Sequence, residues 1–255
     1  MRKALQILAA LSLTAIALAG PATWAGDGRR MLGAAEAAAW AGVGRLNMAG
    51  TRFCTGTLIS ERLVLTAAHC LYNPRTGARV PVSEIRFVAG LRLGDYAGVR
   101  GVAAMATAAG YRYDAKATTA RIARDVALLA LDAPMAAAAF PVAALRADDL
   151  TMTVVSYARD RAHAPSIQQG CAVTHRIGAV SALACDVTFG VSGAPVFSMA
   201  EGAPRVVALV SAMGRADGRK VALTVDVAQE VSALRAQLAQ VGAVSPPFAA
   251  AAQNH

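Results

Sequence analysis

The sequence is divided into short, valine-rich apolar runs separated by Gly, Pro, Asp and Asn. Such runs are typical of strands in all-β proteins, and no rhythm of strands alternating with long helices is present. Six candidate strands lie in the first half, at residues 43–48, 52–59, 63–66, 84–89, 99–106 and 126–131. Six more lie in the second half, at residues 152–157, 171–177, 183–187, 195–199, 205–212 and 220–225. The pattern therefore predicts an all-β fold in two halves.

The two halves meet in the Pro- and Ala-containing segment 132–148, so we predict one unit at 41–136 and a second at 137–225. A helix is predicted over 226–241. Asp226 can cap its start together with Gln229. An apolar stripe then follows at helical spacing: Val227, Val231, Leu234 and Leu238. Residues 242–255, with two prolines and an Ala run, are predicted to be a frayed tail.

Residues 1–25 have the layout of a secretory signal. Arg2 and Lys3 precede an apolar run at 4–19, and small residues flank Trp24. The run is shorter than the roughly 20 residues that span a membrane, so we expect cleavage rather than anchoring. The mature protein is expected to be secreted or periplasmic, without a membrane span. Residues 26–40 are interpreted as an N-terminal segment or a short pro-region.

The net charge of +9 comes from scattered basic residues rather than a dense run, and no nucleic-acid motif occurs. We therefore expect no nucleic-acid partner, and we expect a monomer. No cofactor motif is present, so we predict no cofactor and no metal, with calcium left open.

All four cysteines lie in the mature part of the chain, and an even count in an exported protein indicates disulfides. Three pairings are possible. The economical one is local, with Cys54–Cys70 in the first half and Cys171–Cys185 in the second. A zinc site is the alternative, although no CxxC pair occurs.

Three short segments carry the chemistry. His69 ends an apolar run in a small-residue turn, Asp125 stands at the mouth of an apolar strand, and Ser192 lies between glycines. A serine hydroxyl needs a base to take its proton, and histidine has a suitable pKa. An aspartate can hold the imidazole in the useful tautomer, and the N–H groups of Gly190 and Ser192 could receive an oxyanion. The three side chains are thus candidate catalytic residues.

These segments resemble the signatures of trypsin-like serine peptidases, in that family's order of His, Asp and Ser. The matching motifs are Thr66-Ala67-Ala68-His69-Cys70, Asp125-Val126-Ala127-Leu128-Leu129, Gly190-Val191-Ser192-Gly193-Ala194-Pro195 and Cys54-Thr55-Gly56-Thr57-Leu58-Ile59-Ser60. The resemblance implies two six-stranded antiparallel β-barrels with a C-terminal α-helix, and a catalytic cleft between the barrels. It also implies hydrolysis of a polypeptide substrate through an acyl-enzyme, and a Cys54–Cys70 disulfide beside the histidine.

Val191 departs from the animal enzymes of the family, which have an aspartate just before the serine that pairs with a newly cut N-terminus. Valine cannot form that ion pair, although Arg30 offers a cleavage point. The pattern is similar to the bacterial branch that includes the V8-like glutamyl endopeptidases. We therefore expect the oxyanion loop to be formed by packing, without a cut.

The primary specificity pocket rests on weaker signals. Asp186 lies where an ungapped match places the pocket floor, which would favour Arg or Lys in the substrate. The alternative is a loop carboxylate beside Cys185, paired with Arg176. Ser211 resembles the strand that pairs with substrate backbone, and together with Gly214 it is a candidate pocket residue.

Two other functions compete with an active endopeptidase. A catalytically weak or inactive relative could act as a basic binding protein on the same scaffold, but it would not need all three catalytic side chains. An esterase of the α/β-hydrolase type has its serine within G-x-S-x-G and its histidine last in the chain. Here the second glycine is missing and His69 comes first.

Overall fold

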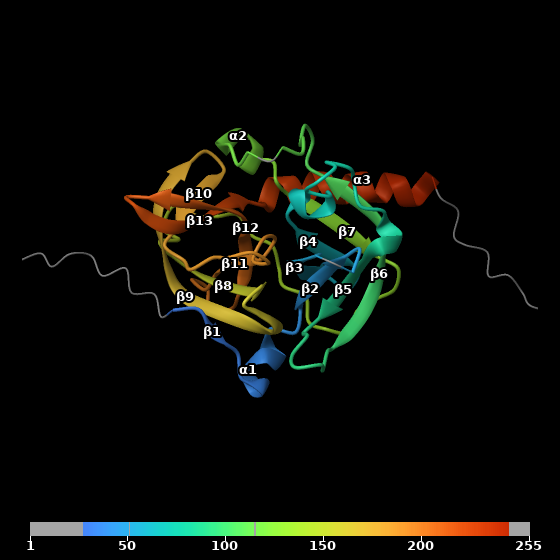
Figure 1. Ribbon diagram of the computed structural model, residues 1–255, viewed down its shortest axis with the longest axis horizontal. Coiled ribbons are helices and arrows are strands. Elements are labelled where there is room, and N and C mark those ends of the chain that lie inside the picture. The colour runs from blue at the N-terminus through green and yellow to red at the C-terminus, as the bar shows by residue number, and fades with distance from the viewer. Residues whose placement is uncertain (1–27, 51, 115, 245–255) are drawn as a thin grey trace, which may run out of the picture.

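The computed structural model describes residues 28–50, 52–114 and 116–244 (Figure 1). The expected signal segment and residues 245–255 of the expected tail lie outside the described residues. Within the described ranges, no helix is both long enough and apolar enough to cross a membrane.

Six antiparallel strands form the first barrel, closed in the order β2-β3-β4-β7-β6-β5. They are β2 (Val43–Met48), β3 (Arg52–Ser60), β4 (Leu63–Thr66), β5 (Ile85–Ala89), β6 (Gly98–Thr107) and β7 (Ala127–Leu131). Valine and leucine fill the interior because they suit a pleated, buried surface. Val64 of β4, for example, lies opposite Leu129 of β7, and both are fully buried.

The second barrel has the order β9-β10-β13-β12-β11-β8, and it closes where β8 pairs with β9. Its strands are β8 (Thr151–Ala158), β9 (Arg161–Ile177), β10 (Val180–Leu183), β11 (Pro195–Ser198), β12 (Arg205–Ala216) and β13 (Arg219–Asp226). The predicted architecture of two six-stranded barrels is therefore confirmed. The chain passes from one barrel to the other between β7 and β8.

Two predicted strands of the second half had wrong bounds. The run 183–187 was predicted as a strand, but β10 ends at Leu183. A turn at Gly178, which has a φ of 57°, returns the chain so that pairing already begins between Ile177 and Val180. The run 171–177 is only the end of β9, which starts at Arg161 because its first part pairs with β8.

Residues 28–40 contain a strand and a helix that the sequence pattern did not predict. Strand β1 (Arg30–Met31) pairs with β9, and helix α1 (Ala34–Ala39) follows it. Leu32 between them is only 1% exposed. The segment interpreted as a possible pro-region is therefore packed on the second barrel.

The closing helix α3 runs over Ala228–Val244, slightly later than the predicted 226–241. The Oδ1 atom of Asp226 accepts a hydrogen bond of 3.1 Å from the N–H of Ala228 at its start. The stripe of Val231, Leu234 and Leu238 is buried. Although α3 follows the second barrel in the chain, it packs on β6 and β7 of the first (Figure 1). The helix thereby ties the two barrels together.

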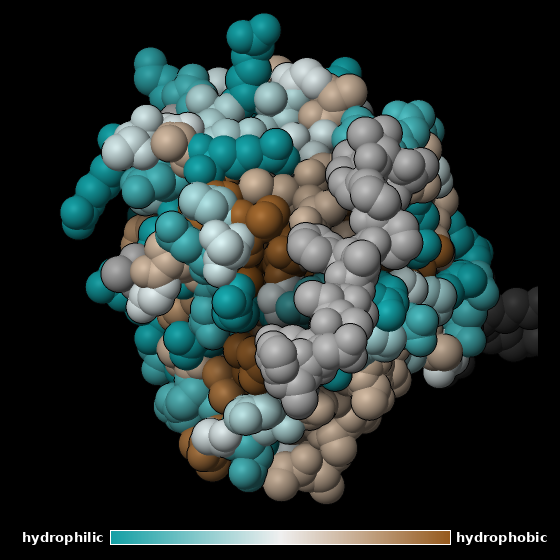
Figure 2. Space-filling view, turned by 90° about the vertical axis from the view of Figure 1, so that its right-hand side faces the viewer, coloured by the Kyte–Doolittle hydropathy of each residue, from teal (hydrophilic) through white to brown (hydrophobic). Residues whose placement is uncertain are grey.

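Figure 2 shows the face of the first barrel on the right-hand side of Figure 1. Hydrophobic residues lie left of centre in this view, with hydrophilic residues on their outer side. The remaining short helices are α2 (Thr119–Ile122), η1 (Ala68–Leu71) and η2 (Val82–Glu84). Of these, η1 carries His69.

Candidate active site

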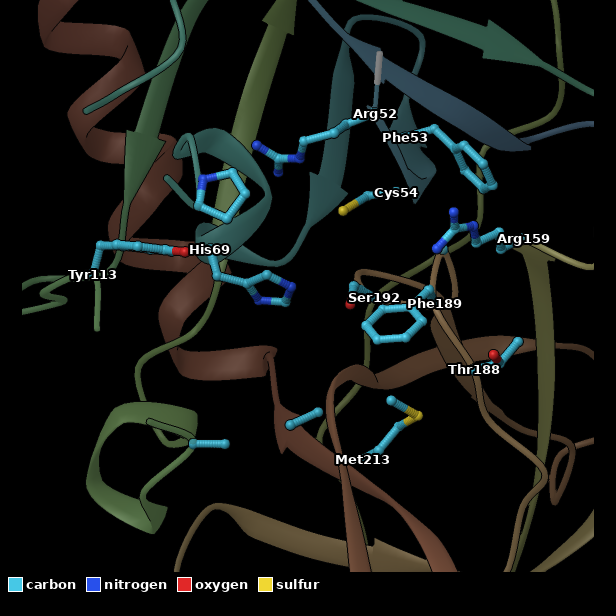
Figure 3. Close-up of a pocket in the computed structure, with 14 residues that line it drawn as sticks. Arg52, Phe53, Cys54, His69, Tyr113, Arg159, Thr188, Phe189, Ser192 and Met213 are labelled. Carbon is cyan, nitrogen blue, oxygen red and sulfur yellow. The ribbon is translucent and has the colours of Figure 1, made fainter. Parts of the chain in front are cut away.

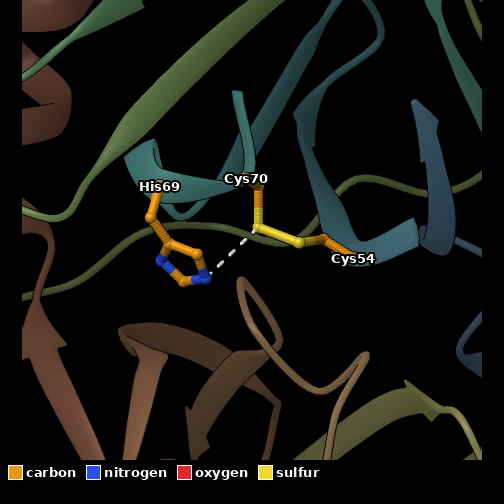
Figure 4. A group of neighbouring side chains, drawn as sticks. All are labelled: Cys54, His69 and Cys70. Carbon is orange, nitrogen blue, oxygen red and sulfur yellow. Dashed lines mark hydrogen bonds between the residues drawn. A yellow bond between two sulfur atoms is a disulfide. The ribbon is translucent and has the colours of Figure 1, made fainter. Parts of the chain in front are cut away.

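His69 lies in the 3-10 helix η1, directly after β4. The small residues before it, Ala67 and Ala68, are fully buried, so the turn can pack closely against the barrel. Cys70 forms a disulfide with Cys54 of β3, which fixes the turn to the neighbouring strand (Figure 4). The side chain of His69 is 21% exposed and thus remains open to the cleft.

The four cysteines form the two predicted disulfides, Cys54–Cys70 and Cys171–Cys185. Cys54, His69 and Cys70 do gather within 4.8 Å of one another, as a metal site would require. Both sulfur atoms are bonded to each other, however, so neither is the thiolate that binds zinc. The zinc alternative does not fit these residues.

Asp125 is fully buried, and both of its carboxylate oxygens are used. Oδ1 accepts a hydrogen bond of 2.8 Å from the backbone N–H of His69, and Oδ2 lies 2.7 Å from Nδ1 of the same residue. Oδ2 also accepts a hydrogen bond from the hydroxyl of Ser211. A carboxylate only accepts hydrogen bonds, so Nδ1 must carry a proton and Nε2 is left as an acceptor.

Ser192 lies on a loop of residues 188–194, between β10 and β11, that is held in a special backbone conformation. Gly190 and Gly193 have φ angles of 92° and 78°, which L side chains rarely adopt. A Cβ added at Gly193 would also lie 2.3 Å from the carbonyl oxygen of Thr55. The neighbouring Val191 is only 1% exposed, so this residue anchors the loop by burial rather than by charge.

The imidazole of His69 is directed toward Ser192 across the cleft (Figure 3). Both line a cavity of about 690 Å³. Among the described residues, no acceptor bonds to the backbone N–H of Gly190 or of Ser192. Two donors thus remain available beside the hydroxyl, where an oxyanion would need them.

Thr55 of β3 connects the first barrel to this loop. Its backbone N–H donates to the carbonyl oxygen of Ser192 at 2.9 Å, and its Oγ1 donates to that of Gly190 at 3.0 Å. The same Oγ1 accepts a hydrogen bond of 2.9 Å from the N–H of Tyr157. One buried side chain therefore fixes the nucleophile loop and strand β8 together.

Burial and charge perturb two groups near the site. Burial lowers the pKa of Arg52, which lines the cleft, below its ordinary value. Burial raises the pKa of Tyr111, and the negative charge of Asp125 adds to that increase. Both groups keep their usual protonation state at neutral pH, so Arg52 contributes a positive charge to the cleft.

The structure does not bring Asp186 to the cleft. Its carboxylate lies 3.6 Å from Nη2 of Arg29 and 3.8 Å from Nζ of Lys220, and it does not line the cavity. Asp186 is thus a loop carboxylate, as the alternative interpretation had it, but the pairing with Arg176 in that alternative is wrong. The guanidinium of Arg176 donates to the carbonyl oxygens of Arg146 and Asp149 instead. The expectation that Asp186 forms the floor of the specificity pocket is therefore not supported.

Of the two other candidate pocket residues, Ser211 is 3% exposed and holds Asp125. Gly214 pairs with Val221 within β12 and β13. The cleft is lined instead by their neighbours Ala212 and Met213. A serine inside an apolar strand needs a polar partner, and this signal could have linked Ser211 to the buried carboxylate.

Comparisons with known proteins agree with this geometry. A family model described as Trypsin matches residues 33–236. A Glu endopeptidase solved in complex with MPD is similar at a TM-score of 0.70 and 19% identity, covering 84% of this chain and 98% of its own. The thermostable serine protease AL20 from an extremophilic microorganism is similar at a TM-score of 0.64 and 15% identity, and the match covers 80% of this chain and 99% of AL20. Protease Anisep from Arthrobacter nicotinovorans is similar at a TM-score of 0.63 and 17% identity, and the match covers 78% of this chain and 96% of Anisep.

The search of curated proteins found no match. The family model spans most of the chain, and the chain therefore belongs to the trypsin family. By this membership it is a serine-type endopeptidase, and its substrate class is polypeptide. The solved structures are too distant in sequence to indicate more than the shared fold.

Proposed function

We propose that His69, Asp125 and Ser192 are the catalytic triad of an endopeptidase that works through an acyl-enzyme. The observation that carries this assignment is the hydrogen-bonded pair of Asp125 and His69 Nδ1, which faces Ser192 across the cleft. Nε2 lies 3.9 Å from Sγ of Cys70, but a disulfide sulfur has no proton to donate, so Nε2 can still take a proton from the serine hydroxyl.

In the first half of the reaction, Oγ of Ser192 attacks the scissile carbonyl while Nε2 of His69 takes its proton. The carbonyl oxygen becomes an oxyanion, which the N–H groups of Gly190 and Ser192 stabilise. His69 then gives its proton to the leaving amine, and the peptide C–N bond breaks. In the second half, His69 takes a proton from water, whose oxygen attacks the acyl-enzyme. The bond between the acyl carbon and Oγ then breaks, His69 returns the proton to Oγ of Ser192, and the carboxylic acid product leaves. Asp125 remains ionised and stabilises the imidazolium.

Labelling with a serine-directed phosphonate tests the triad. The wild-type protein should be labelled on Ser192 and should cleave peptides. Ser192→Ala should abolish labelling, and His69→Ala should slow it by at least about 10³-fold, because the hydroxyl loses its base. A folded wild-type protein that is neither labelled nor active would instead support the competing basic binding protein.

We further propose that the oxyanion loop is formed on folding, without a cut after Arg30. Burial of Val191 and the hydrogen bonds from Thr55 support this interpretation. A chain beginning at Gly26 should be at least as active as one beginning at Met31. Strict dependence of activity on the shorter chain would overturn the proposal.

We also propose that the protein is exported and acts as a monomer. The signal-like residues 1–25 and the two disulfides support export to the periplasm or the medium. We expect a monomer without nucleic-acid partners. Fractionation of a producing bacterium and light scattering of the purified protein would test these expectations.

A further inference from the structure

Two arginines, Arg52 and Arg159, line the cleft near Phe53 (Figure 3). Among the described residues that line it, there is no aspartate or glutamate. A cleft lined by charge of one sign attracts substrate groups of the opposite sign. The cleft is therefore suited to peptides that carry carboxylates.

The charge of Arg52 is not neutralised within the described part of the chain. Its guanidinium donates to the carbonyl oxygens of Tyr72, at 2.6 Å, and Cys70, at 3.2 Å, and forms no ion pair with a carboxylate. Carbonyl groups hold the side chain in place without cancelling its charge. A guanidinium has five N–H donors, so several remain for a ligand.

The side chain of Arg159 is held by fewer contacts than that of Arg52. Its backbone N–H donates to the carbonyl oxygen of Phe189 at 2.7 Å, which places the residue beside the nucleophile loop. Its exposed side chain makes no hydrogen bond or ion pair with any described residue. The adjacent Asp160 already accepts two hydrogen bonds from Arg29. The nearest carboxylate in the sequence is thus bound to another cation.

The two arginines lie on one side of the nucleophile. Arg52, Phe53 and Arg159 are on the side of Ser192 that faces away from Met213 (Figure 3). Ala212 and Met213 of β12 pair with β13 on one edge. Strand β11 pairs with β12 only as far as Leu209, so the opposite edge, which faces the cleft, has no strand partner among the described residues. An extended peptide can pair with such an edge. If the part of the substrate before the scissile bond pairs with this edge of β12, the part after the bond extends toward the two arginines.

We propose that Arg52 and Arg159 form a subsite for an Asp or Glu side chain in the first two residues after the scissile bond. This assignment rests on the triad proposed above. The two guanidinium groups lie at separate points on this side of the cleft (Figure 3), and each can bind a carboxylate through charge-assisted hydrogen bonds. Phe53 forms its apolar wall and is fixed by Arg45, whose guanidinium carbon lies 4.6 Å from the ring centre.

The test uses internally quenched peptides built on one cleavable sequence that differ only at these two positions, with Glu, Gln or Lys. The wild-type enzyme should cleave the Glu peptide with a kcat/KM about 5–10-fold above the Gln peptide, and further above the Lys peptide. The Glu/Gln ratio should fall toward 1 at 1 M salt, because the pairs are partly exposed.

Variants separate the subsite from the general charge of the protein. Arg159→Glu should bring the Glu and Lys peptides close to equal, because Arg52 and the new carboxylate offset each other. Arg52→Gln should lower the Glu/Gln ratio several-fold. Arg62→Gln, in the turn between β3 and β4, changes an exposed guanidinium outside the cleft and should leave the ratio unchanged.

Phosphonate labelling of each variant distinguishes a failed subsite from a failed triad. Loss of labelling in the wild type would refute the triad itself. With labelling intact, equal kcat/KM for the three peptides would refute the subsite proposal. A Glu/Gln ratio of kcat/KM that neither Arg52→Gln nor Arg159→Glu changes would refute it too. Cleavage of the Glu peptide at a shifted bond, so that Glu lies before the scissile bond, would also overturn the proposal, since the arginines would then contact the acyl side.

Discussion

Replacing Thr55 with valine tests how the oxyanion loop is held. Valine has nearly the same shape as threonine but neither donates nor accepts hydrogen bonds. The change would leave the N–H of Tyr157 and the carbonyl oxygen of Gly190 without Oγ1 as a partner. Both contacts join the first barrel to the second, so the substitution removes polar links across the barrel interface without creating a cavity.

The expected cost follows from the burial of these groups. Thr55 and Tyr157 are both fully buried, and an unsatisfied buried polar group costs about 1–3 kcal/mol. Gly190 borders the cleft, where water can replace the lost hydroxyl, so its share is smaller. We expect a loss of about 2–4 kcal/mol in unfolding free energy. For a protein of this size, that corresponds to a fall in Tm of roughly 5–15 °C.

Activity should fall as well, because Gly190 supplies a proposed oxyanion donor. Complete loss of such a donor costs about 10²–10³ in kcat, so a loosened loop should cost roughly 10-fold or more, with KM nearly unchanged. The assays are phosphonate labelling and peptide cleavage, both well below the Tm of the variant. Thr55→Ser keeps the hydroxyl and should recover most of the rate. A valine variant with reduced Tm but a labelling rate within twofold of wild type would refute the reasoning.

Two further predictions concern stability. Arg29→Met should lower Tm by roughly 3–8 °C, because Arg29 is buried, with 8% of the residue exposed, and its guanidinium donates two hydrogen bonds to Asp160. Arg30→Met removes an exposed pair with Glu36 and should change Tm by less than about 2 °C. Equal effects of the two substitutions in thermal melts would contradict this prediction. Burial raises the pKa of Asp226 in the folded protein. Above that pKa the buried carboxylate is ionised and destabilises the fold. This destabilisation is absent once pH falls below the pKa of Asp in the unfolded chain, about 3.9. Asp226→Asn retains an oxygen that can cap α3 and should raise Tm at pH 7 by about 1–3 °C but not at pH 3; a gain of the same size at both pH values would contradict the assignment.

Local sequence patterns predicted much of the fold. The bounds of β2 and β4 match the predicted runs 43–48 and 63–66, because each run is apolar and ends at a turn. The two residues of β1 carry no periodic signal, so their pairing with β9 could be found only in three dimensions. The start of β9 was missed for a similar reason, since Pro165 interrupts the pattern within the strand.

In the candidate site too, local motifs predicted some residues, and others could be found only from three-dimensional contacts. His69, Asp125 and Ser192 stand in short motifs that can be read locally. The structure brings His69 and Ser192 to one cleft and buries Asp125 against the imidazole. Thr55 was missed as a functional residue because its partners are 102 and 135 positions away in the sequence. The apparent match of Asp186 to a pocket floor depended on counting residues through a loop. In three dimensions this carboxylate lies beside Arg29 and Lys220 instead.

Val191 links the proposed mechanism to the way the protein becomes active. An aspartate at this position would need a cationic partner, whereas a buried valine stabilises the loop by roughly 1.5–3 kcal/mol as soon as the barrel forms. Burial has no preferred direction, so it cannot orient the peptide groups of the loop. The hydrogen bonds from Thr55 to Gly190 and Ser192, and the bond of 2.7 Å from the N–H of Gly193 to Val210, supply that orientation. Every one of these groups belongs to the folded barrels, and this is why we expect folding alone to form a competent loop, without a separate proteolytic step.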